Sequence, residues 1–239
     1  RILGLGAFTA AVGDGGVTVA RRLGMPVTTG RSLTVAIAVE ALEEAARARD
    51  VALQSATVAV VGATGCIGSA CAELLASLTG ELLLVARQES RLAQEQARVV
   101  AAGARRVRIS TRVEDIRDAD VVLSASGAAR VVIEPEHLKH GAIVCDVAQP
   151  PDVSPRVARE RGDVLVFEGG IMDMPGAADL GFDLALPPGK TYACMAEAMV
   201  LTLEGRYESY SLGKRVRVEQ VREIAQLARR HGFRATMNA

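Results

Sequence analysis

The chain has 239 residues with 28 basic and 28 acidic side chains, so its formal net charge is zero. This balance argues against a generic nucleic-acid-binding protein, which is usually clearly basic, and against a disordered acidic chain. Hydrophobic residues make up 49% of the sequence and aromatic residues only 3%, so the core is expected to be aliphatic, as in parallel sheets covered by helices. The length suffices for one large domain or two small ones.

Targeting and cross-linking signals are absent from the sequence. The longest run without a charge, residues 51–72, holds Gln54, three glycines and several hydroxyl side chains, which argues against a membrane span. No secretory signal peptide is evident, and because the sequence begins with Arg1 we expect a fragment of a longer protein. The cysteines lack a C-x-x-C spacing and the histidines do not cluster, so we predict no disulfide framework, no metal site and a cytoplasmic location.

Strand and helix patterns alternate through most of the chain. A helix is predicted from Ser32 or Thr34 to a point before Val51, after an extended segment at 26–30. The predicted strands then cover 57–61, 82–85, 107–110, 121–124, 142–146 and 164–167, and the helices between them cover 69–77, 91–102 and 113–119. This order predicts an α/β fold with a doubly wound, mostly parallel Rossmann-type sheet flanked by helices.

The glycine turn at residues 62–68 is the most informative motif. It reads Gly-Ala-Thr-Gly-Cys-Ile-Gly and lies between a predicted strand and a predicted helix. Glycines in this context allow a tight turn and a close approach of backbone N–H groups to a pyrophosphate at the helix N-terminus. We predict that a dinucleotide binds the turn through Gly62, Ala63, Thr64, Gly65, Cys66, Ile67 and Gly68. The alternative is a tight turn that holds no ligand.

The end of the second predicted strand indicates which dinucleotide binds. An NAD site has Asp or Glu near this point for the ribose 2′-hydroxyl, whereas this sequence has Arg87, with Arg91 one helical turn later. A guanidinium suits a 2′-phosphate through charge-assisted hydrogen bonds, so we favour NADP(H) as the cofactor. The alternative is that Arg87 is a solvated surface residue or pairs with Glu89.

Loops after the later strands are expected at the same edge of the sheet, because ligands of open α/β sheets bind at the carboxyl ends of the strands. Small residues there would let a nicotinamide ring approach, and ordinary turns are the alternative. The residues concerned are Ser124, Ala125, Ser126, Val147, Gly169 and Gly170.

Cys194 is the candidate nucleophile. A predicted helix over 191–204 begins near Lys190 or Thr191 and places Cys194 about one turn from its N-terminus. The helix amides there, and Lys190 if its side chain folds back, would stabilise a thiolate. A small buried core residue is the alternative. A loop at 175–189 precedes this helix, and a last helix is predicted over 218–231.

Several segments carry a resemblance to a known family. They lie at residues 4–9, 27–30, 58–69 and 85–87, with Tyr-Ala-Cys-Met-Ala-Glu at 192–197 and His-Gly-Phe-Arg at 231–234. In this order they resemble the C-terminal two-thirds of the long-chain acyl-(acyl carrier protein) reductases, whose bacterial relatives are often labelled shikimate-dehydrogenase-like. The last two segments are the most specific, and the resemblance spans nearly the whole chain but lacks the family's N-terminal portion.

The resemblance implies an activity and a nucleophile. The implied reaction is the NADPH-dependent reduction of a fatty acyl thioester, carried by acyl carrier protein or CoA, to an aldehyde, and the family's nucleophilic cysteine falls on Cys194. We place Phe8, Thr28 and Thr29 on the substrate side, with capping of the following helix as the favoured alternative for the two threonines. Departures from the family pattern at 146–150 and 169–174 leave a shorter acyl group or another carbonyl substrate open.

Two other classes stay open, an NADP-dependent shikimate or quinate-type alcohol dehydrogenase and a non-catalytic NADP-binding domain. We expect a substrate-side region with a connecting helix at 1–50, a nucleotide-binding domain at 51–189, and C-terminal helices with the candidate nucleophile at 190–239, which pack on the N-terminal helix.

The net charge of zero results from two adjacent segments of opposite charge. Residues 163–204 carry one Lys and seven acidic residues, whereas residues 205–239 carry eight basic and three acidic residues, a face that would suit an acidic acyl carrier protein.

Overall fold

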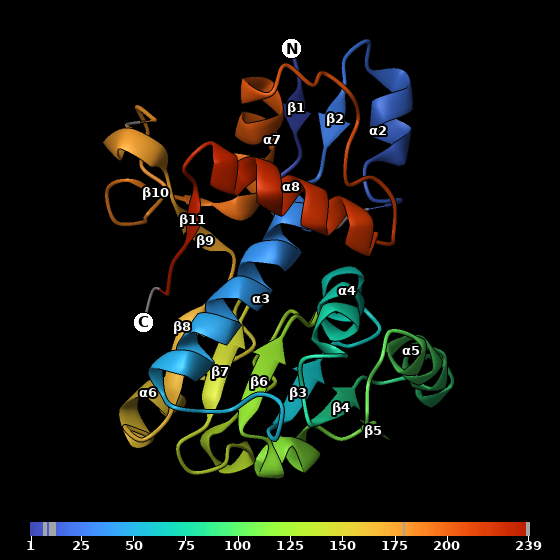
Figure 1. Cartoon of the computed structure of the whole chain (residues 1–239), viewed down its shortest axis with the longest axis vertical. Coiled ribbons are helices and arrows are strands. Elements are labelled where there is room, and N and C mark those ends of the chain that lie inside the picture. Colours follow the sequence, from blue (N-terminus) through green and yellow to red (C-terminus); the bar gives the residue numbers. More distant parts are fainter. Residues whose placement is uncertain (7–8, 10–12, 179, 238–239) are drawn as a thin grey trace. The chain divides into compact units, whose positions relative to one another are not determined.

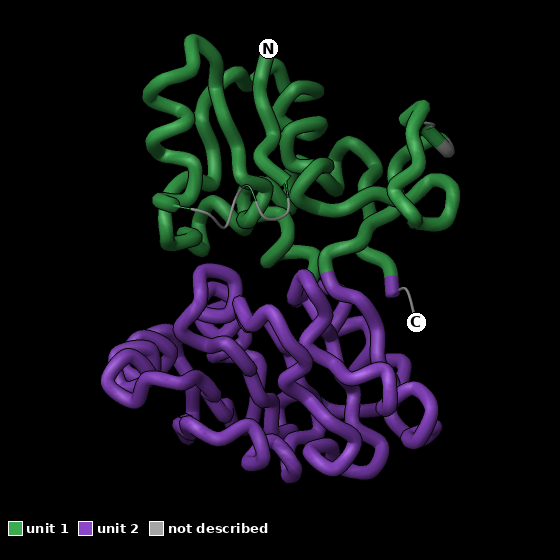
Figure 2. The backbone as a smooth tube through the Cα atoms, turned by 180° about the vertical axis from the view of Figure 1, so that it is seen from behind, with its two compact units in different colours: residues 1–38, 170–236 green, residues 39–169, 237–239 purple. Residues whose placement is uncertain are grey.

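The computed structural model describes residues 1–6, 9, 13–178 and 180–237 (Figure 1). The chain divides into two compact units (Figure 2): unit 1 comprises residues 1–38 and 170–236, and unit 2 comprises residues 39–169 and 237–239. Helix α3 (Arg31–Ala48) contributes its first part to unit 1 and its remainder to unit 2. This division groups residues 170–189 with unit 1, whereas the sequence-based boundaries grouped them with residues 51–169.

Unit 2 is built on a six-stranded, fully parallel sheet with the order β5–β4–β3–β6–β7–β8. Its strands are β3 (Thr57–Val61), β4 (Glu81–Val85), β5 (Val107–Ser110), β6 (Val121–Ser124), β7 (Ile143–Asp146) and β8 (Leu165–Glu168). The chain starts in the middle of the sheet, winds outward to β5, and then returns to the other side of β3. The predicted doubly wound fold is therefore confirmed, and its topological switch point lies between β3 and β6.

The central strands β3, β4, β6 and β7 are buried on both faces, as expected where both faces of a sheet are covered, whereas the edge strand β5 carries the exposed Arg108. Alternate residues such as Ala59, Leu83, Val122 and Val144 face a buried cluster that also holds Ile116. The helical segments of unit 2 are α4 (Cys66–Leu75), α5 (Glu89–Ala101), α6 (Pro155–Glu160) and the 3-10 turns η1 (Val113–Asp118) and η2 (Pro135–His137). Helix α4 contacts β3 and β4, and α5 contacts β4 and β5, as Figure 1 shows.

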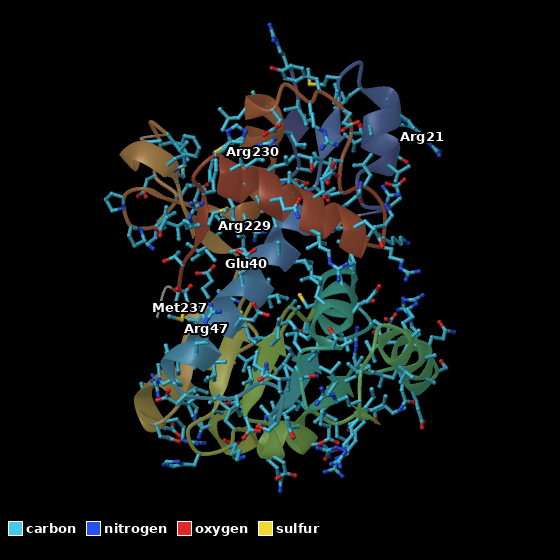
Figure 3. All side chains as sticks on the ribbon, viewed as in Figure 1. Arg21, Glu40, Arg47, Arg229, Arg230 and Met237 are labelled. Carbon is cyan, nitrogen blue, oxygen red and sulfur yellow. The ribbon has the colours of Figure 1, made fainter. Side chains whose placement is uncertain are left out.

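In its described residues, unit 1 combines two small sheets with the first part of α3, further helices and a 3-10 turn. Its strands are β1 (Leu3–Gly4) and β2 (Val27–Thr28), which are parallel, and the antiparallel set β10 (Lys190–Tyr192), β9 (Ile171–Asp173) and β11 (Arg234–Ala235). Its other elements are α2 (Val17–Arg22), η3 (Pro175–Ala177), α7 (Ala193–Leu203) and α8 (Val218–Arg230). Helix α8 buries an aliphatic stripe and contacts α7. Its last turn ends in the exposed Arg229 and Arg230, which Figure 3 labels.

The predicted helix over 191–204 begins later than expected. Residues Lys190–Tyr192 form β10 and pair with β9, with Thr191 opposite Met172, before α7 starts at Ala193. A pairing between strands some twenty residues apart leaves no periodic signal in the local sequence, so the helical pattern concealed it. As a consequence Cys194 is the second residue of its helix. None of the described helices is both long and apolar enough to cross a membrane.

Candidate functional site

The glycine turn lies at the switch point of the sheet in unit 2. Gly62 has a φ of +80°, and a Cβ on it would lie 2.6 Å from the Ala125 carbonyl oxygen in the loop after β6. A Cβ on Gly68 would lie 2.3 Å from the Gly62 carbonyl oxygen, so α4 can approach the strand only with glycine there. These are two of the uses that dinucleotide-binding turns make of their glycines, a tight turn and close helix–strand packing.

The N-terminus of α4 is open to an anion. Gly65 is its N-cap residue, with no side chain to bond the first amides, and among the described residues no acidic side chain lies in its first turn. The first amides of a helix have no acceptor within the helix, so they suit the oxygens of a pyrophosphate. Cys66, Ile67 and Gly68 form this first turn, and helix α4 starts three residues earlier than predicted because Gly65 ends the loop directly.

Other predicted residues of the turn are engaged within the fold. The amides of Gly62 and Ala63 both donate to the Val85 carbonyl, at 2.8 and 3.1 Å, which fixes the turn onto the end of β4. Ala63 is buried, and Thr64 is half-buried. The residues of this turn that fit a pyrophosphate are therefore those at the start of α4 rather than the amides of Gly62 and Ala63.

Arg87 and Arg91 lie at the same edge of the sheet. Arg87 comes two residues after β4, Arg91 lies in the first turn of α5, and both side chains are exposed. Within the described part of the chain, no ion pair with Glu89 engages either guanidinium. Both are thus available to a 2′-phosphate, as the sequence predicts, and this role stays a prediction.

The loops after β6 and β7 are held by two buried carboxylates. The Ser124 and Ser126 hydroxyls donate to Asp152, at 2.6 and 2.5 Å, and the Ser126 amide donates to it at 2.8 Å. Asp146 accepts from the amides of Asp152 and Val153 at 2.8 and 2.9 Å, and from that of Ala148 at 3.0 Å. The two serines that were predicted to face the cofactor thus have hydroxyls committed to Asp152.

The Asp146 carboxyl carries a perturbed pKa. Burial raises the pKa to about 6, against hydrogen bonds from the Val153 and Ala148 amides that favour the ionised form. The sequence analysis placed Asp146 at a strand end without giving it a role, and it missed Asp152. Asp152 has no local signal of its own, because its partners Ser124 and Ser126 come from the end of β6 and the loop after it, more than 25 residues earlier in the chain.

The remaining loop residues pack closely. The Val147 amide donates to the Ser124 carbonyl at 2.7 Å, and a Cβ on Gly169 would lie 2.6 Å from the Cys145 sulfur. In unit 1, Gly170 has a φ of +82°, and its carbonyl accepts from the Ala193 amide at 2.8 Å. Glycine is therefore favoured at 170 by the backbone conformation and at 169 by the close approach of the Cys145 side chain.

Cys194 lies at the second position of α7 in unit 1, half-buried, and no disulfide joins any of the four cysteines. Its backbone lies against Gly30, the residue before α3: a Cβ on Gly30 would lie 2.2 Å from the Cys194 Cα and 2.3 Å from its carbonyl oxygen. Gly30 has a φ of +71°, which an L side chain rarely adopts. Cys194 thus lies at one helix N-terminus and in contact with the residue that opens another, the setting in which a thiolate is favoured.

A buried polar cluster that the sequence analysis missed surrounds the start of α3. Glu197, one turn after Cys194 on α7, accepts hydrogen bonds from the Thr28 hydroxyl and, at 2.8 Å, from the Leu33 amide. Burial raises the pKa of Glu197, opposed by hydrogen bonds from Thr28, Ser211 and the backbone of Leu33 and Gly30. Glu197 lies in an otherwise apolar helix. Because a charged side chain in such a position needs buried hydrogen-bond partners, the sequence did indicate that a cluster of this kind exists.

The predictions for the substrate side and for Lys190 beside the thiolate have separate outcomes. Thr28 and Thr29 are buried, and the Thr29 hydroxyl donates to the Ser211 carbonyl at 2.5 Å, so both hydroxyls are used inside the fold. Phe8 lies outside the described residues. Lys190 does not fold toward α7 but donates to Asp173 on β9 at 3.0 Å and to the Thr236 hydroxyl at 2.7 Å.

A parallel sheet of this strand order, with a glycine turn at its switch point and an open helix N-terminus after it, defines a nicotinamide-nucleotide-binding oxidoreductase domain. The family of shikimate/quinate 5-dehydrogenases matches residues 43–168, and the chain belongs to this family. The family assignment and the residues of the turn agree on a nucleotide cofactor, and the predicted NADP(H) is confirmed.

The chain is also similar to parts of longer proteins. It is 34% identical over 236 residues to the aminotransferase PigE of Serratia sp., covering 98% of this chain and 28% of that protein. It is 34% identical over 214 residues to the long-chain acyl-[acyl-carrier-protein] reductase of Synechococcus elongatus, covering 86% of this chain and 61% of that protein. The chain thus spans less than two thirds of either relative. Among solved structures, the glutamyl-tRNA reductase from Methanopyrus kandleri aligns with 56% of this chain and 34% of its own, at 25% identity and a TM-score of 0.46.

Proposed function

We propose that the chain reduces an acyl thioester, carried by acyl carrier protein or CoA, to an aldehyde with NADPH, and that Cys194 is the nucleophile. The observation that carries the proposal is the place of Cys194, half-buried at the second position of α7 with its backbone against Gly30. The similarity to the Synechococcus reductase, 34% over 214 residues, supports the same reaction class.

The proposed reaction has two steps. The Cys194 thiolate attacks the thioester carbonyl, an S–C bond forms on Cys194, and the carrier thiolate leaves and takes up a proton. NADPH, when bound, supplies a hydride. After its transfer to the carbonyl carbon of the acyl group on Cys194, the resulting thiohemiacetal anion expels the Cys194 thiolate and releases the aldehyde. The amides at the start of α7 stabilise the thiolate at the beginning and at the end of this sequence.

We assign cofactor binding to unit 2. The amides of Cys66, Ile67 and Gly68 hold the pyrophosphate at the N-terminus of α4, and Arg87 with Arg91 hold the 2′-phosphate. The loops at Ser124–Ser126 and Val147, braced by Asp152 and Asp146, support the nicotinamide side.

We also propose a cytoplasmic location. We propose further that an acidic carrier protein docks on the basic residues 205–239, which predicts a steep decrease in rate with added salt.

The test is NADPH oxidation in the presence of acyl-CoA thioesters of graded length, followed by absorbance, with aldehyde trapped as product. Cys194→Ser is expected to abolish the reaction while it leaves NADPH binding intact. Cys71→Ala, which changes a buried cysteine in the interior of α4, is the control and should retain activity. Oxidation that continues unchanged in Cys194→Ser would exclude the covalent route.

A second candidate function is the oxidation of a hydroxy acid of the shikimate or quinate type. It needs a Lys–Asp pair, and Lys190 and Asp173 form one on adjacent strands, 3.0 Å apart. NADP⁺ reduction with shikimate or quinate that is lost in Lys190→Met and kept in Cys194→Ser would favour this candidate. The reverse pattern, thioester reduction lost only in Cys194→Ser, favours the first. NADPH binding without turnover of any of these compounds would favour a non-catalytic binding domain.

A further inference from the structure

Glu197 is a buried carboxylate in unit 1. It is fully buried on α7, and within the described part of the chain no Lys, Arg or His forms an ion pair with it. Its hydrogen bonds come from neutral donors, among them the Thr28 hydroxyl and the Leu33 amide, the latter at 2.8 Å. Leu33 is the third residue of α3, so the carboxylate occupies the N-terminus of that helix.

The same short segment of chain also contacts Cys194. The Thr28 hydroxyl, which donates to Glu197, accepts a hydrogen bond from the Gly30 amide at 3.2 Å. Gly30 in turn lies against the Cys194 backbone. Cys194 and Glu197 are three residues apart and therefore on the same face of α7. The helix is thus attached to residues 28–33 at two points, one at the nucleophile and one at the carboxylate.

The burial of Glu197 decides which kind of role it can have. A side chain with no exposed surface has no direct access to substrate or solvent, which favours a positioning role for Glu197 over direct acid–base chemistry. An isolated buried carboxylate is also unfavourable for stability compared with an apolar residue of similar size. A buried carboxylate that accepts hydrogen bonds from a neighbouring segment can hold its own helix in a fixed position relative to that segment.

We infer that Glu197 is a positioning residue for Cys194: through Thr28 and the Leu33 amide it fastens α7 to the start of α3, and this holds the thiol between two helix N-termini. The inference rests on the proposed function for the acyl transfer, but the position of the thiol is a property of unit 1 alone. Loss of the Glu197 contacts should therefore change the rate constant for reactions of the Cys194 thiol rather than the affinity for substrate.

Four variants test the inference. Glu197→Met keeps the length of the side chain and removes its hydrogen bonds, Glu197→Gln keeps an acceptor for the Leu33 amide, and Thr28→Val removes the hydroxyl between Gly30 and Glu197. The double variant Thr28→Val/Glu197→Met shows whether the two act through one contact. Thr191→Val is the control, because the buried Thr191 hydroxyl has no hydrogen-bond partner among the described residues.

The first readout is acyl transfer from acyl-CoA to Cys194 without NADPH. We expect Glu197→Met and Thr28→Val to lower the saturating rate about tenfold or more with KM changed less than about threefold, since each leaves buried donors without acceptors. Glu197→Gln and Thr191→Val should stay within about threefold of the wild type, and the double variant should be no slower than Glu197→Met. Wild-type rates in Glu197→Met, no rescue by glutamine, or multiplicative effects in the double variant would each overturn the inference.

The second readout is alkylation by iodoacetamide, with Cys194 and Cys66 followed separately by peptide mass mapping. We expect Glu197→Met and Thr28→Val to slow alkylation of Cys194 while Cys66, in unit 2, reacts as in the wild type. The wild-type chain could accept no acyl group while its Cys194 alkylation still depends on Glu197. That result would contradict the proposed function and support the inference. Alkylation of Cys194 that is unchanged in folded Thr28→Val would overturn the inference itself.

Discussion

The N-termini of α4 and α3 use the same physical property in opposite ways. Both present backbone amides that lack acceptors within the helix and attract negative charge. At α4 the three glycines leave this end without a side-chain cap, among the described residues, whereas at α3 the protein fills the corresponding place with its own Glu197 carboxylate. An open helix end in unit 2 suits a ligand phosphate, and a filled one in unit 1 fixes a neighbouring helix.

This difference separates binding residues from positioning residues. The groups of unit 2 that fit the cofactor are amides and exposed arginines, which need no buried charge. The groups around Cys194 are buried and mutually bonded, so a change there alters geometry before it alters any contact with a ligand. Variants of the two regions should therefore give separable effects, one on nucleotide affinity and one on the reactivity of the thiol.

The largest effect is expected from Gly30→Ala. The new Cβ would lie 2.2 Å from the Cys194 Cα at a φ of +71°, so either residue must shift, with a loss of about 2–4 kcal/mol in the free energy of unfolding. Acyl transfer to Cys194 should fall about 100-fold or more while NADPH affinity is retained. Gly205→Ala has a similar φ of +68° but no atom within 4 Å, and a comparable loss of acyl transfer in that control would contradict the account.

The next effect concerns pH and the buried Asp146 of unit 2. Its pKa is raised from 3.8 to about 6, so the stability that it contributes is fully present below about pH 4 and is lost as pH rises through 6. Between pH 4 and pH 7 the unfolding free energy of the wild type, measured relative to Asp146→Asn, should fall by about 2 kcal/mol. Urea titrations at pH 4, 5, 6 and 7 measure this difference, and a difference that is constant with pH would refute the assignment.

A smaller effect is expected at the proposed nucleotide-binding site of unit 2. Arg87→Ala should weaken NADPH binding about 10- to 100-fold and leave NADH binding nearly unchanged, because only NADPH carries the 2′-phosphate. Arg105→Ala is the matched control, since Arg105 is also exposed in unit 2 but precedes β5, at the amino edge of the sheet. Equal losses for the two nucleotides in Arg87→Ala, measured by fluorescence titration, would remove Arg87 from the 2′-phosphate site.

The smallest effect is a gain. Thr191→Val removes a buried hydroxyl that has no partner among the described residues and keeps the branched shape of the side chain in β10. The free energy of unfolding should rise by about 1 kcal/mol, with NADPH affinity and thiol reactivity unchanged. Denaturant unfolding measures it, and destabilisation would mean that the hydroxyl is satisfied in solution.

The sequence was most informative where structure depends on local patterns. The β-branched run at 57–61, the glycines at 62–68 and the strand–helix alternation after them predicted the doubly wound sheet and the glycine turn after its first strand, because each is a short-range signal. A helix after the turn was also predicted, although α4 starts three residues earlier than expected, and the place of Arg87 follows from the end of the second predicted strand. The nucleotide half of the candidate site was therefore largely predictable.

Unit 1 was predicted less well because its elements depend on distant partners. Strand β10 exists through pairing with β9, and Glu197 is bonded to residues more than 160 positions away in the sequence. The partners in both contacts cannot be identified from the local pattern, so β10 was predicted as helix and the partners of Glu197 were missed, although a glutamate among apolar helix residues indicates that buried partners exist. The resemblance identified Cys194 as a candidate, whereas its position against Gly30 required the structure.

The most direct test of the central claim is the mass of the intact protein after incubation with acyl-CoA in the absence of NADPH. The account predicts one added acyl group, located on Cys194 by peptide mapping, that disappears when NADPH is supplied and aldehyde forms. Cys194→Ser should gain no such mass, and Cys71→Ala should gain it as the wild type does. A wild-type chain that binds NADPH but acquires no acyl group, or acquires it on Cys66, would contradict the account.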